Sequence, residues 1–366
     1  MTERERQILE LLKQDPLIPQ QQLADQLGLS RSAVAGHIMN LTQKGHILGK
    51  GYVLAPSRYA LVLGGANLDL CGKSQGALHF GDSNPGTLSA SAGGVARNIA
   101  DNLARLGSPV QFVSALGDDD WGERLLAACR QSGMGLDGLL RVPGARTCVY
   151  LSVHDNSGEM QLALSDMEVL KRLDAKALQD RSGLVDRAAI WVLDANLDEE
   201  ALAWLFARHA GQPVLVDPVS TAKAPKLKPY LGQIQCLKPN ALEAGVLTGI
   251  RVTDRASAQA AAQALVAQGV GEVLLTLGAD GALLANQQGC HWLASRVSQL
   301  VNVTGAGDAA LAAMAHGLLQ HQDLAQRTDF ALWAAALAAS HQDTIHPLMS
   351  EAAVWRLKET THATVS

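Results

Sequence analysis

In residues 1–55, hydrophobic positions recur at the spacing of amphipathic helices. A proline-bounded break at 15–19 and the turn Gly28-Leu29-Ser30, whose serine is a good N-cap, divide this stretch into helices. Residues 47–54 then alternate around two glycines and predict a small hairpin. The three predicted helices run through Ile8–Leu12, over Gln20–Leu27 and over Arg31–Gln43. This order of elements predicts a winged helix-turn-helix domain over residues 1–55.

From residue 58 onward, short and continuously apolar runs alternate with amphipathic stretches of helical length. Continuous apolar strands are typical of a sheet whose two faces are both covered by helices. The sequence therefore predicts a second domain, over residues 58–366, with a doubly wound, mainly parallel α/β sheet. We expect strands at 60–63, 110–113, 190–193, 214–216 and 273–275, and helices at 95–106, 122–132, 198–209, 256–268 and 306–319.

Two segments of the second domain, at about 70–90 and 146–166, break this alternation. In them apolar and polar residues alternate with a period of two, as in the run 148–153. Strands of this pattern fit a small β-sheet that stands off the main domain. We expect that sheet to act as a lid.

The composition limits the classes of protein that need to be considered. The chain is 48% hydrophobic and 18% charged with a net charge of −5, which argues against disorder and against a protein devoted to nucleic acid. Its five cysteines are scattered without a CxxC pair, so neither a zinc site nor a disulfide framework is predicted. Reduced thiols fit the cytoplasm, where we expect the protein to lie. The sequence has neither an apolar signal core nor a run of about 18 apolar residues, so we expect no membrane partner.

The N-terminal domain differs in charge from the rest of the chain. No acidic residue occurs from Gln26 to Leu68, and we therefore expect DNA as a partner through residues 20–54. The basic residues of this stretch are Arg31, Lys44, Lys50 and Arg58. Four cations per subunit give weak phosphate binding, so a DNA-binding form would be a dimer. A three-helix interaction or dimerisation module is the alternative that the pattern leaves open.

The strongest chemical signal is Asn-Val-Thr-Gly-Ala-Gly-Asp at 302–308, which precedes an Ala-rich helix. Small residues let the backbone approach a ligand, and a helix start offers N–H groups and a partial positive charge. Gly305, Ala306 and Gly307 would thus stabilise the charge on a transferring phosphoryl group. Asp308 follows where its carboxylate can take a proton from a substrate hydroxyl. The alternative is a tight turn with an aspartate N-cap.

Two further turns suit a polar small molecule. Gly93 and Gly94 open a helix, and Asn98 on its first turn can donate to and accept from hydroxyl groups. After the first strand, Asn67 and Asp69 lie on the same side of an extended segment. A paired amide and carboxylate suit the vicinal hydroxyls of a sugar. An ordinary strand-to-helix turn and a solvent-facing loop are the respective alternatives.

Two weaker motifs follow. Asn240 and Glu243 share a helix face and suit a hydrated Mg²⁺ beside phosphates, although a capped helix explains them equally well. The turn Thr-Leu-Gly-Ala-Asp-Gly at 276–281 suits a nucleotide. A GxxxxGK[ST] loop is absent from the sequence, which argues against a P-loop kinase. His341 and His346 have no Cys or His at metal spacing, and we interpret them as structural, or at most as lining the nucleotide pocket.

At this point the chain resembles the PfkB/ribokinase family of carbohydrate kinases over about residues 58–355. The resemblance rests on Gly-Gly-Val-Ala-Arg-Asn at 93–98 and Val-Thr-Gly-Ala-Gly-Asp at 303–308. It implies the cofactors ATP and Mg²⁺, with Asp308 as the base that activates the substrate hydroxyl. It further implies an anion hole at Gly305, Ala306 and Gly307, sugar contacts at Asn67, Asp69, Gly93, Gly94 and Asn98, metal contacts at Asn240 and Glu243, and nucleotide contacts at Lys238, Thr276, Gly278, Gly281 and Asn302.

One position departs from the family pattern. Many relatives bind a monovalent cation with an Asp at the position of Asn302, so K⁺ dependence stays open.

Four other segments make the resemblance within the family more specific. The segments that resemble kinases acting on pseudouridine are 82–86, 157–160, 165–167 and 216–220. They imply phosphorylation of the 5′-hydroxyl of that C-nucleoside, with Asp166 of the lid at the substrate.

Two alternatives to that function stay open. One is a kinase for another ribosyl sugar or nucleoside. The other is a DNA-binding regulator that senses a sugar or nucleoside through a kinase fold. A homodimer is expected by analogy with the family and with helix-turn-helix modules.

Overall fold

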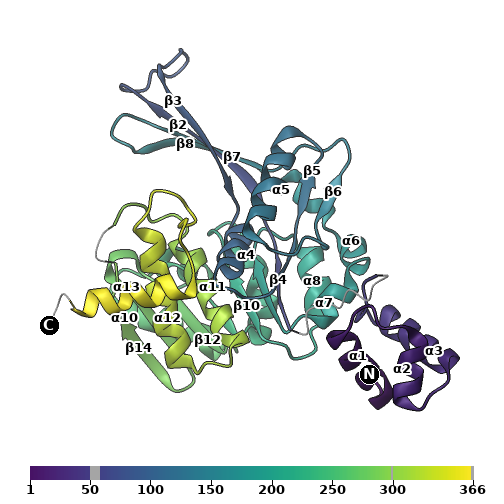
Figure 1. The fold of residues 1–366 in the computed structure, drawn as a ribbon. Helices are drawn as coiled ribbons and strands as arrows, with labels where there is room; N and C mark the ends of the chain where they lie inside the picture. The colour runs from purple at the N-terminus through teal and green to yellow at the C-terminus, as the bar shows by residue number, and fades with distance from the viewer. Residues whose placement is uncertain (50–57, 298–299, 364–366) are drawn as a thin grey trace. The chain divides into compact units, whose positions relative to one another are not determined.

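The structure is a computed structural model that describes residues 1–49, 58–297 and 300–363 of the 366-residue chain (Figure 1). The chain divides into two compact units, residues 1–57 and 58–366. Each unit buries a hydrophobic core of its own. Among the helices in the described ranges, none is long and apolar enough to cross a membrane.

The first unit contains three helices, α1 (Glu3–Gln14), α2 (Gln20–Leu27) and α3 (Arg31–Gln43), as predicted. Ser30 caps α3, because its hydroxyl accepts the amide of Ala33 at 3.1 Å. The predicted hairpin covers 47–54, of which residues 50–54 lie outside the described residues. The apolar side chains that fill the core of the three helices include Ile8, Leu12, Leu23, Val34 and Leu41.

An eight-stranded sheet forms the centre of the second unit. Its strands, in spatial order, are β14 (Gly289–Leu293), β13 (Ala282–Asn286), β12 (Glu272–Thr276), β11 (Cys236–Leu237), β10 (Val214–Asp217), β9 (Ile190–Asp194), β1 (Ala60–Leu63) and β4 (Val110–Val113). The strands from β12 to β4 are parallel, which confirms the prediction. The antiparallel edge made by β13 and β14 was not predicted.

Helices cover both faces of this sheet (Figure 1). Alternate residues of β1 face the two layers, since Ala60 and Val62 belong to one core cluster and Leu61 and Leu63 to the other. One layer contains α4 (Val95–Arg105), α5 (Asp120–Ser132), α11 (Ala306–Leu319), α12 (Leu324–Ala339) and α13 (Glu351–Ala363). The other contains η1 (Glu168–Arg172), α6 (Ala175–Gln179), α7 (Ser182–Arg187), α8 (Glu199–Ala207), η2 (Ala224–Gln233), α9 (Ala241–Thr248) and α10 (Arg255–Ala267).

The hydrophobic pattern did not predict α12 and α13. Helix α12 is buried on most of its surface, and a helix that is apolar nearly all round lacks the amphipathic period on which the prediction relied. The remaining elements are short. They are β5 (Ala115–Gly117), β6 (Leu140–Val142) and η3 (Gly278–Asp280).

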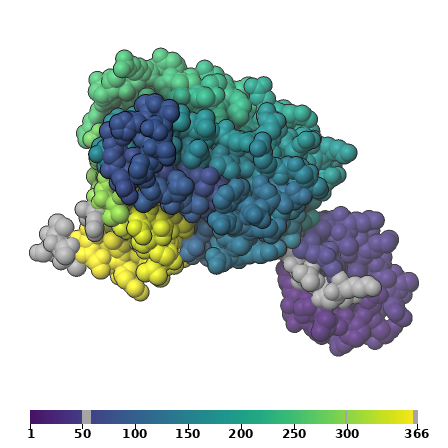
Figure 2. Space-filling model, turned by 90° about the horizontal axis from the view of Figure 1, so that it is seen from above, coloured from purple at the N-terminus to yellow at the C-terminus, as the bar shows by residue number. Residues whose placement is uncertain are grey.

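The two segments that break the alternation form a separate four-stranded sheet, as predicted. Its strands, in spatial order, are β3 (Gly86–Gly93), β2 (Asn67–Ser74), β7 (Val149–His154) and β8 (Met160–Asp166). This sheet stands off the main sheet of the same unit, and the blue strands β2 and β3 project over the teal and green body (Figures 1 and 2). We call it the lid sheet.

The strand register gives the lid sheet two different faces, because directly opposed residues point to the same side. Asp69 pairs with Ser91 and Tyr150, and Tyr150 pairs with Ser165, so these four define a polar lid face. The adjacent row points the other way and defines an apolar lid face. The residues of the apolar lid face include Leu68, Leu70, Leu88, Ala90, Ala92, Val149, Leu151, Val153, Leu162, Leu164 and, at its base, Asp166.

Candidate active site

The turn before α11 has the backbone geometry expected of the predicted anion hole. Gly305 has φ +86°, and a Cβ there would lie 2.2 Å from the carbonyl oxygen of Thr344. At Gly307 a Cβ would lie 2.9 Å from Lys238 Nζ. Helix α11 begins at Ala306, so its first N–H groups and its partial positive charge face this turn. The small residues of the motif are therefore required both by the backbone and by the neighbouring ammonium group.

Asp308 lies in the first turn of α11 and is buried. Asn98 Nδ2 donates a hydrogen bond to Asp308 Oδ2 at 2.8 Å. Burial raises the pKa of Asp308 to about 7, and the charge of Asp217 acts in the same direction, against Asn98 and Lys238. A carboxyl group with a pKa near neutrality is suited to act as a general base.

Lys238 and Asp217 form a buried ion pair beside this carboxyl group. Lys238 Nζ lies 2.9 Å from Asp217 Oδ2, and the two side chains are 8% and 6% exposed. Burial acts to lower the pKa of Lys238, but the charges of Asp217 and Asp308 outweigh it and raise that pKa. Lys238 therefore remains a cation next to Gly307 of the predicted anion hole.

Asp217 was missed by the sequence analysis, although it ends strand β10 within the segment 216–220. Its Oδ1 also accepts the amide of Val219 at 2.8 Å. Val219 has φ +66°, a conformation that a β-branched residue rarely adopts. The local backbone is thus held in an unfavourable shape where it presents Asp217 to Lys238.

The loops that carry the predicted sugar contacts meet at the start of α4. Asn67 Nδ2 donates to Asp69 Oδ1 at 2.5 Å, and burial raises the pKa of Asp69. A Cβ at Gly93 would lie 2.0 Å from Asp69 Oδ2, and one at Gly94, where φ is +98°, would lie 2.5 Å from the carbonyl oxygen of Gly65. The bond between Asn98 and Asp308 joins this group to the anion hole.

Asp166 lies apart from that group. It sits at the base of the apolar lid face, whereas Asp69 is on the polar lid face. There it lines a hollow of about 380 Å³ together with Asn196 and Lys226. Tyr150 and Ser165, which the sequence analysis did not single out, share the face of Asp69.

Two hollows meet at the turn after β12. One, of about 360 Å³, is lined by Ala306 and Gly307, and the other has a volume of about 570 Å³. Thr276 and Gly278 line both, so the structure brings these predicted nucleotide contacts next to the anion hole. A Cβ at Gly281, where φ is +90°, would lie 2.1 Å from the carbonyl oxygen of Leu293. The apolar residues that line the smaller hollow include Leu274, Ala282, Val297, Leu300, Val303, Ala310 and Leu332.

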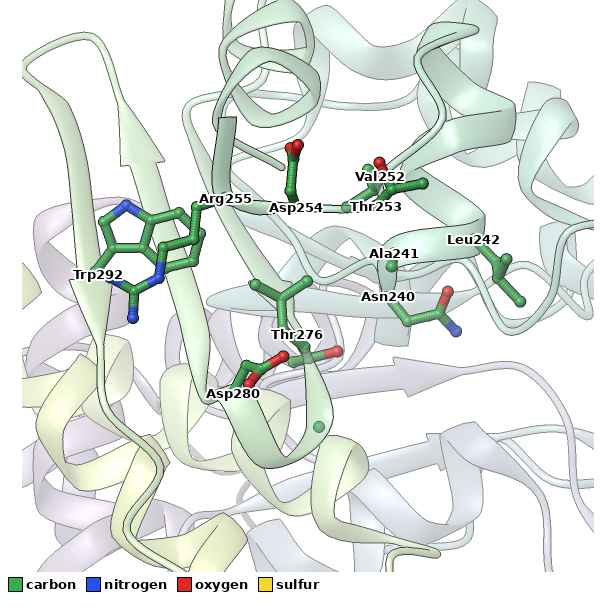
Figure 3. A pocket seen from close by; sticks show the side chains of 12 residues that line it. Asn240, Ala241, Leu242, Val252, Thr253, Asp254, Arg255, Thr276, Asp280 and Trp292 are labelled. Atoms are coloured by element: carbon green, nitrogen blue, oxygen red, sulfur yellow. The ribbon is translucent and has the colours of Figure 1, made fainter. Parts of the chain in front are cut away.

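Figure 3 shows the larger hollow. Asn240, the N-cap of α9, and Thr276, at the end of β12, lie near one another at its centre and are joined by an isolated β-bridge. At one side Arg255 lies over the ring of Trp292, with its guanidinium carbon 4.9 Å from the ring centre. A charged group and a flat aromatic surface thus border the opening.

Asn240 and Glu243 cap helix α9 reciprocally. The amide of Glu243 donates to Asn240 Oδ1, and the amide of Asn240 donates to Glu243 Oε2, both at 2.9 Å. Burial raises the pKa of Glu243. In the described ranges, no group of three or more His, Cys, Asp or Glu residues is arranged to hold a metal ion. The capped-helix interpretation is confirmed, and metal binding by these residues stays a prediction.

Asn302 ties the anion-hole turn to the loop after α12. Its Nδ2 donates to the carbonyl oxygen of Gln342 at 2.9 Å, and its Oδ1 accepts the amide of Thr304 at 2.9 Å. His341 and His346 belong to the same loop, and their ring centres are 5.2 Å apart. Both contacts of Asn302 are to the backbone, so this side chain holds the turn to the loop after α12.

Each of the two units matches a known protein family. Residues 57–351 match the model described as pfkB family carbohydrate kinase, which is more than half of the chain. The chain belongs to the pfkB family of carbohydrate kinases. The kinase is therefore an ATP-dependent phosphotransferase with an alcohol group as its acceptor. Residues 1–47 match the model described as winged helix-turn-helix DNA-binding.

Individual relatives resemble the kinase over most of its length. The pseudouridine kinase of Escherichia coli (strain K12) is 40% identical over 302 residues, which cover 82% of this chain and 96% of the relative. The uncharacterized sugar kinase YeiI of the same organism is 36% identical over 351 residues, which cover 96% and 97%. A solved structure, a carbohydrate kinase from Agrobacterium tumefaciens, has a TM-score of 0.69 and 29% identity, and the match covers 82% of this chain and 96% of that one.

Replacing Asp308 with Asn should abolish turnover while leaving the fold and ATP binding intact. We expect kcat to fall by about 10³-fold or more, because the amide cannot accept the hydroxyl proton. Since burial raises the pKa of this carboxyl group, its ionisation destabilises the folded state as pH rises above the unfolded value. The neutral amide side chain of this variant would avoid that cost, so Tm should increase, and more at about pH 8 than at about pH 5. Retained turnover would remove Asp308 from the base role.

The pH profile should show the titration of the same carboxyl group. We expect kcat/KM for the acceptor to rise about tenfold per pH unit below about pH 7 and to level off above it, because the base must be ionised. Asp217→Asn removes a negative charge that raises this pKa and should move the acid limb to lower pH. Asp186→Asn, at an exposed ion pair with Arg208, is the control and should leave the limb in place. An unshifted limb in Asp217→Asn would contradict this account.

Proposed function

We propose that the protein transfers the γ-phosphoryl group of ATP to the 5′-hydroxyl of a nucleoside, most specifically pseudouridine. The observation that carries the proposal is the bond from Asn98 to Asp308, because it joins the glycine turns that suit an acceptor to a buried base at the start of a helix. The 40% identity to a pseudouridine kinase over 82% of the chain supports the choice of acceptor.

Three groups around the start of α11 would take part in the transfer. Asp308 takes the proton of the acceptor hydroxyl as that oxygen bonds to the γ-phosphorus, and ADP leaves with the electrons of the broken P–O bond. The first amides of α11, with Gly305 to Gly307, would stabilise the charge on the equatorial oxygens. Lys238, kept cationic by Asp217, would add a positive charge beside them.

The nucleotide and its metal ion fit the same end of the sheet. The turn from Thr276 to Gly281 and the apolar walls of the smaller hollow suit a flat base. Asn240 and Glu243 offer oxygen ligands of the kind that Mg²⁺ prefers when it also keeps waters and phosphates. Mg²⁺ would supply charge neutralisation between the phosphates. Asn302 supports the turn, and we propose no separate K⁺ contact for it.

A nucleoside fits the polar lid face better than a simple sugar does. Tyr150 stands directly opposite Asp69 on the neighbouring parallel strand, so the two side chains leave the same face about one strand spacing, ~4.8 Å, apart. An acceptor whose ribose hydroxyls bind Asp69 would therefore bring a base at its C1′ next to the tyrosine ring. Tyrosine rings bind flat bases by stacking. Asp166 lies on the other face of the lid sheet, so it would affect the acceptor site only indirectly, through the hollow that it lines, and would not contact the base.

We also propose that two copies pair through the apolar lid face. Leu88, Leu162 and Leu164 on this face are 87%, 50% and 59% exposed, which is unusual for three leucines on one small sheet. A second copy would present the same face and bury both, as an isologous interface does.

The winged helix-turn-helix unit supports DNA as a further partner, and a regulator that senses its ligand is the second candidate function. Arg31 begins α3 and is exposed. Lys44 is less available than the sequence indicated, because its Nζ contacts both carboxylate oxygens of the buried Glu5 at 2.8 Å. DNA binding would therefore be weak in one copy and would need the pair.

We place the kinase in the cytoplasm. Its five cysteines are unpaired thiols, and Cys129, Cys148 and Cys236 are buried. Reduced thiols and ATP are both typical of that compartment.

ATP consumption with Mg²⁺ against pseudouridine, uridine, adenosine, inosine and ribose tests the acceptor. We expect pseudouridine to be preferred, and Tyr150→Ala to raise its KM about tenfold while KM for ribose stays unchanged, because stacking is lost only for a base. Tyr150→Phe keeps the ring and is the control. Preference for another acceptor would discard pseudouridine but keep the kinase. Ligand binding without any turnover would favour the regulator.

Sedimentation of variants on the two lid faces tests the pairing. Leu88→Lys places a charge on the apolar lid face and should convert a dimer into monomers, because an unpaired ammonium cannot be buried without a large penalty. Thr87→Lys is the matched control, since the neighbouring residue on the same strand points to the other face. A monomeric wild type, or equal behaviour of the two variants, would refute the interface.

A further inference from the structure

Asp194, at the carboxyl end of β9, is a fully buried carboxylate to which no part in the reaction has been given. Its Oδ2 accepts three hydrogen bonds, from the amide of Gly65 at 3.0 Å, the amide of Ala96 at 2.9 Å and Asn196 Nδ2 at 2.8 Å. Its Oδ1 accepts the amide of Asn196 at 2.9 Å. Four hydrogen bonds from N–H groups offset part of the loss of water, although burial still raises the pKa of Asp194 above its usual value.

Two of the four donors, the amides of Gly65 and Ala96, lie in segments that are far apart in the sequence, and the other two belong to Asn196. Gly65 lies in the loop that leads to Asn67 and Asp69 on β2. Ala96 lies in the first turn of α4, two residues before Asn98, which contacts Asp308. A single oxygen atom of Asp194 therefore joins the two loops of the acceptor site.

The backbone around this carboxylate is shaped to fit it. Gly64 has φ +151°, and a Cβ there would lie 2.2 Å from Asp194 Oδ1. Ser114 Oγ donates to the carbonyl oxygen of Gly64 at 2.7 Å and holds the turn from its other side. Beyond Asp194, Asn196 Oδ1 accepts a hydrogen bond from Lys223 Nζ, so the network ends on a cation. These contacts leave Asp194 little freedom to turn toward a ligand.

We propose that Asp194 is a positioning residue that holds the loop of Asn67 and Asp69 against the start of α4, so that the acceptor hydroxyl is presented to Asp308. This inference rests on the proposed function, because it concerns the same acceptor site. The carboxylate also acts at longer range. Its negative charge is among the influences that raise the pKa of Asp308, after burial and the charge of Asp217.

Asp194→Asn tests the proposal with the acceptor that the wild type phosphorylates. The amide has one acceptor oxygen in place of two, so it cannot satisfy the amides of both loops and of Asn196. We expect KM for the acceptor to rise about tenfold or more while KM for ATP stays within about twofold of the wild-type value. The acid limb of kcat/KM should move to lower pH, because a negative charge near Asp308 is removed. Asp186→Asn is the matched surface control.

Asn196→Ala serves if Asp194→Asn does not fold. It removes one donor and keeps the charge, so we expect a smaller rise in acceptor KM, about threefold, without a shift of the acid limb. Wild-type acceptor KM in the folded variants would overturn the proposal. An equal rise in KM for ATP would do the same, because it would indicate general loosening.

Hydrogen exchange separates this inference from the proposed function. If the wild type turns over none of the acceptors, the proposed function fails, but the positioning of the loops is still measurable. Faster exchange of the amides at 64–67 and 94–98 in Asn196→Ala, with unchanged exchange near Arg208, would support the link through Asp194. Unchanged exchange at both 64–67 and 94–98 would overturn the proposed link.

Discussion

The burial of the Asp308 carboxyl group is the constraint on which the site depends. A carboxylate without water is unfavourable, and here the bond from Asn98, the ammonium of Lys238 and the start of α11 offset that penalty only in part. The remaining imbalance raises the pKa of the group toward the range in which a base both accepts and releases a proton. With Asp308 as the base that we propose, the features that hold these partners in place serve the chemistry as well as the fold.

The parallel sheet explains why partners from distant parts of the sequence meet. Asp194 ends β9, Asp217 ends β10 and Lys238 follows β11, and these are adjacent strands. Parallel strands bring their carboxyl ends to one edge, where ligands of open α/β sheets bind. The lid sheet adds a second constraint, because a shift of one residue along a strand moves a side chain to the opposite face. That parity puts Tyr150 with Asp69 and places Asp166 on the other side.

Much of the fold and part of the site were predictable from the sequence, for physical reasons that differ. Glycines at 93–94 and 305–307 mark backbone that must approach other atoms closely, and this requirement is local, so the turns were found. The parts of Asp217 and Asp194 depend on which strands become neighbours, which periodicity does not encode. Lys44 was counted as available for DNA, but its ion pair with Glu5 joins residues 39 positions apart. The face of Asp166 depended on a register that the hydrophobic pattern did not give.

The contact between Gly64 and Asp194 also limits how this sequence can change. A Cβ at position 64 would overlap the carboxylate, and a longer acid at 194 would have to enter the space that the glycine leaves. A larger residue at position 64, or a longer side chain at position 194, would therefore be unfavourable on its own, whereas Asp194→Asn keeps the shape of the side chain. The size of the side chain that one position can hold therefore depends on the residue at the other, although the two lie 130 positions apart in the chain.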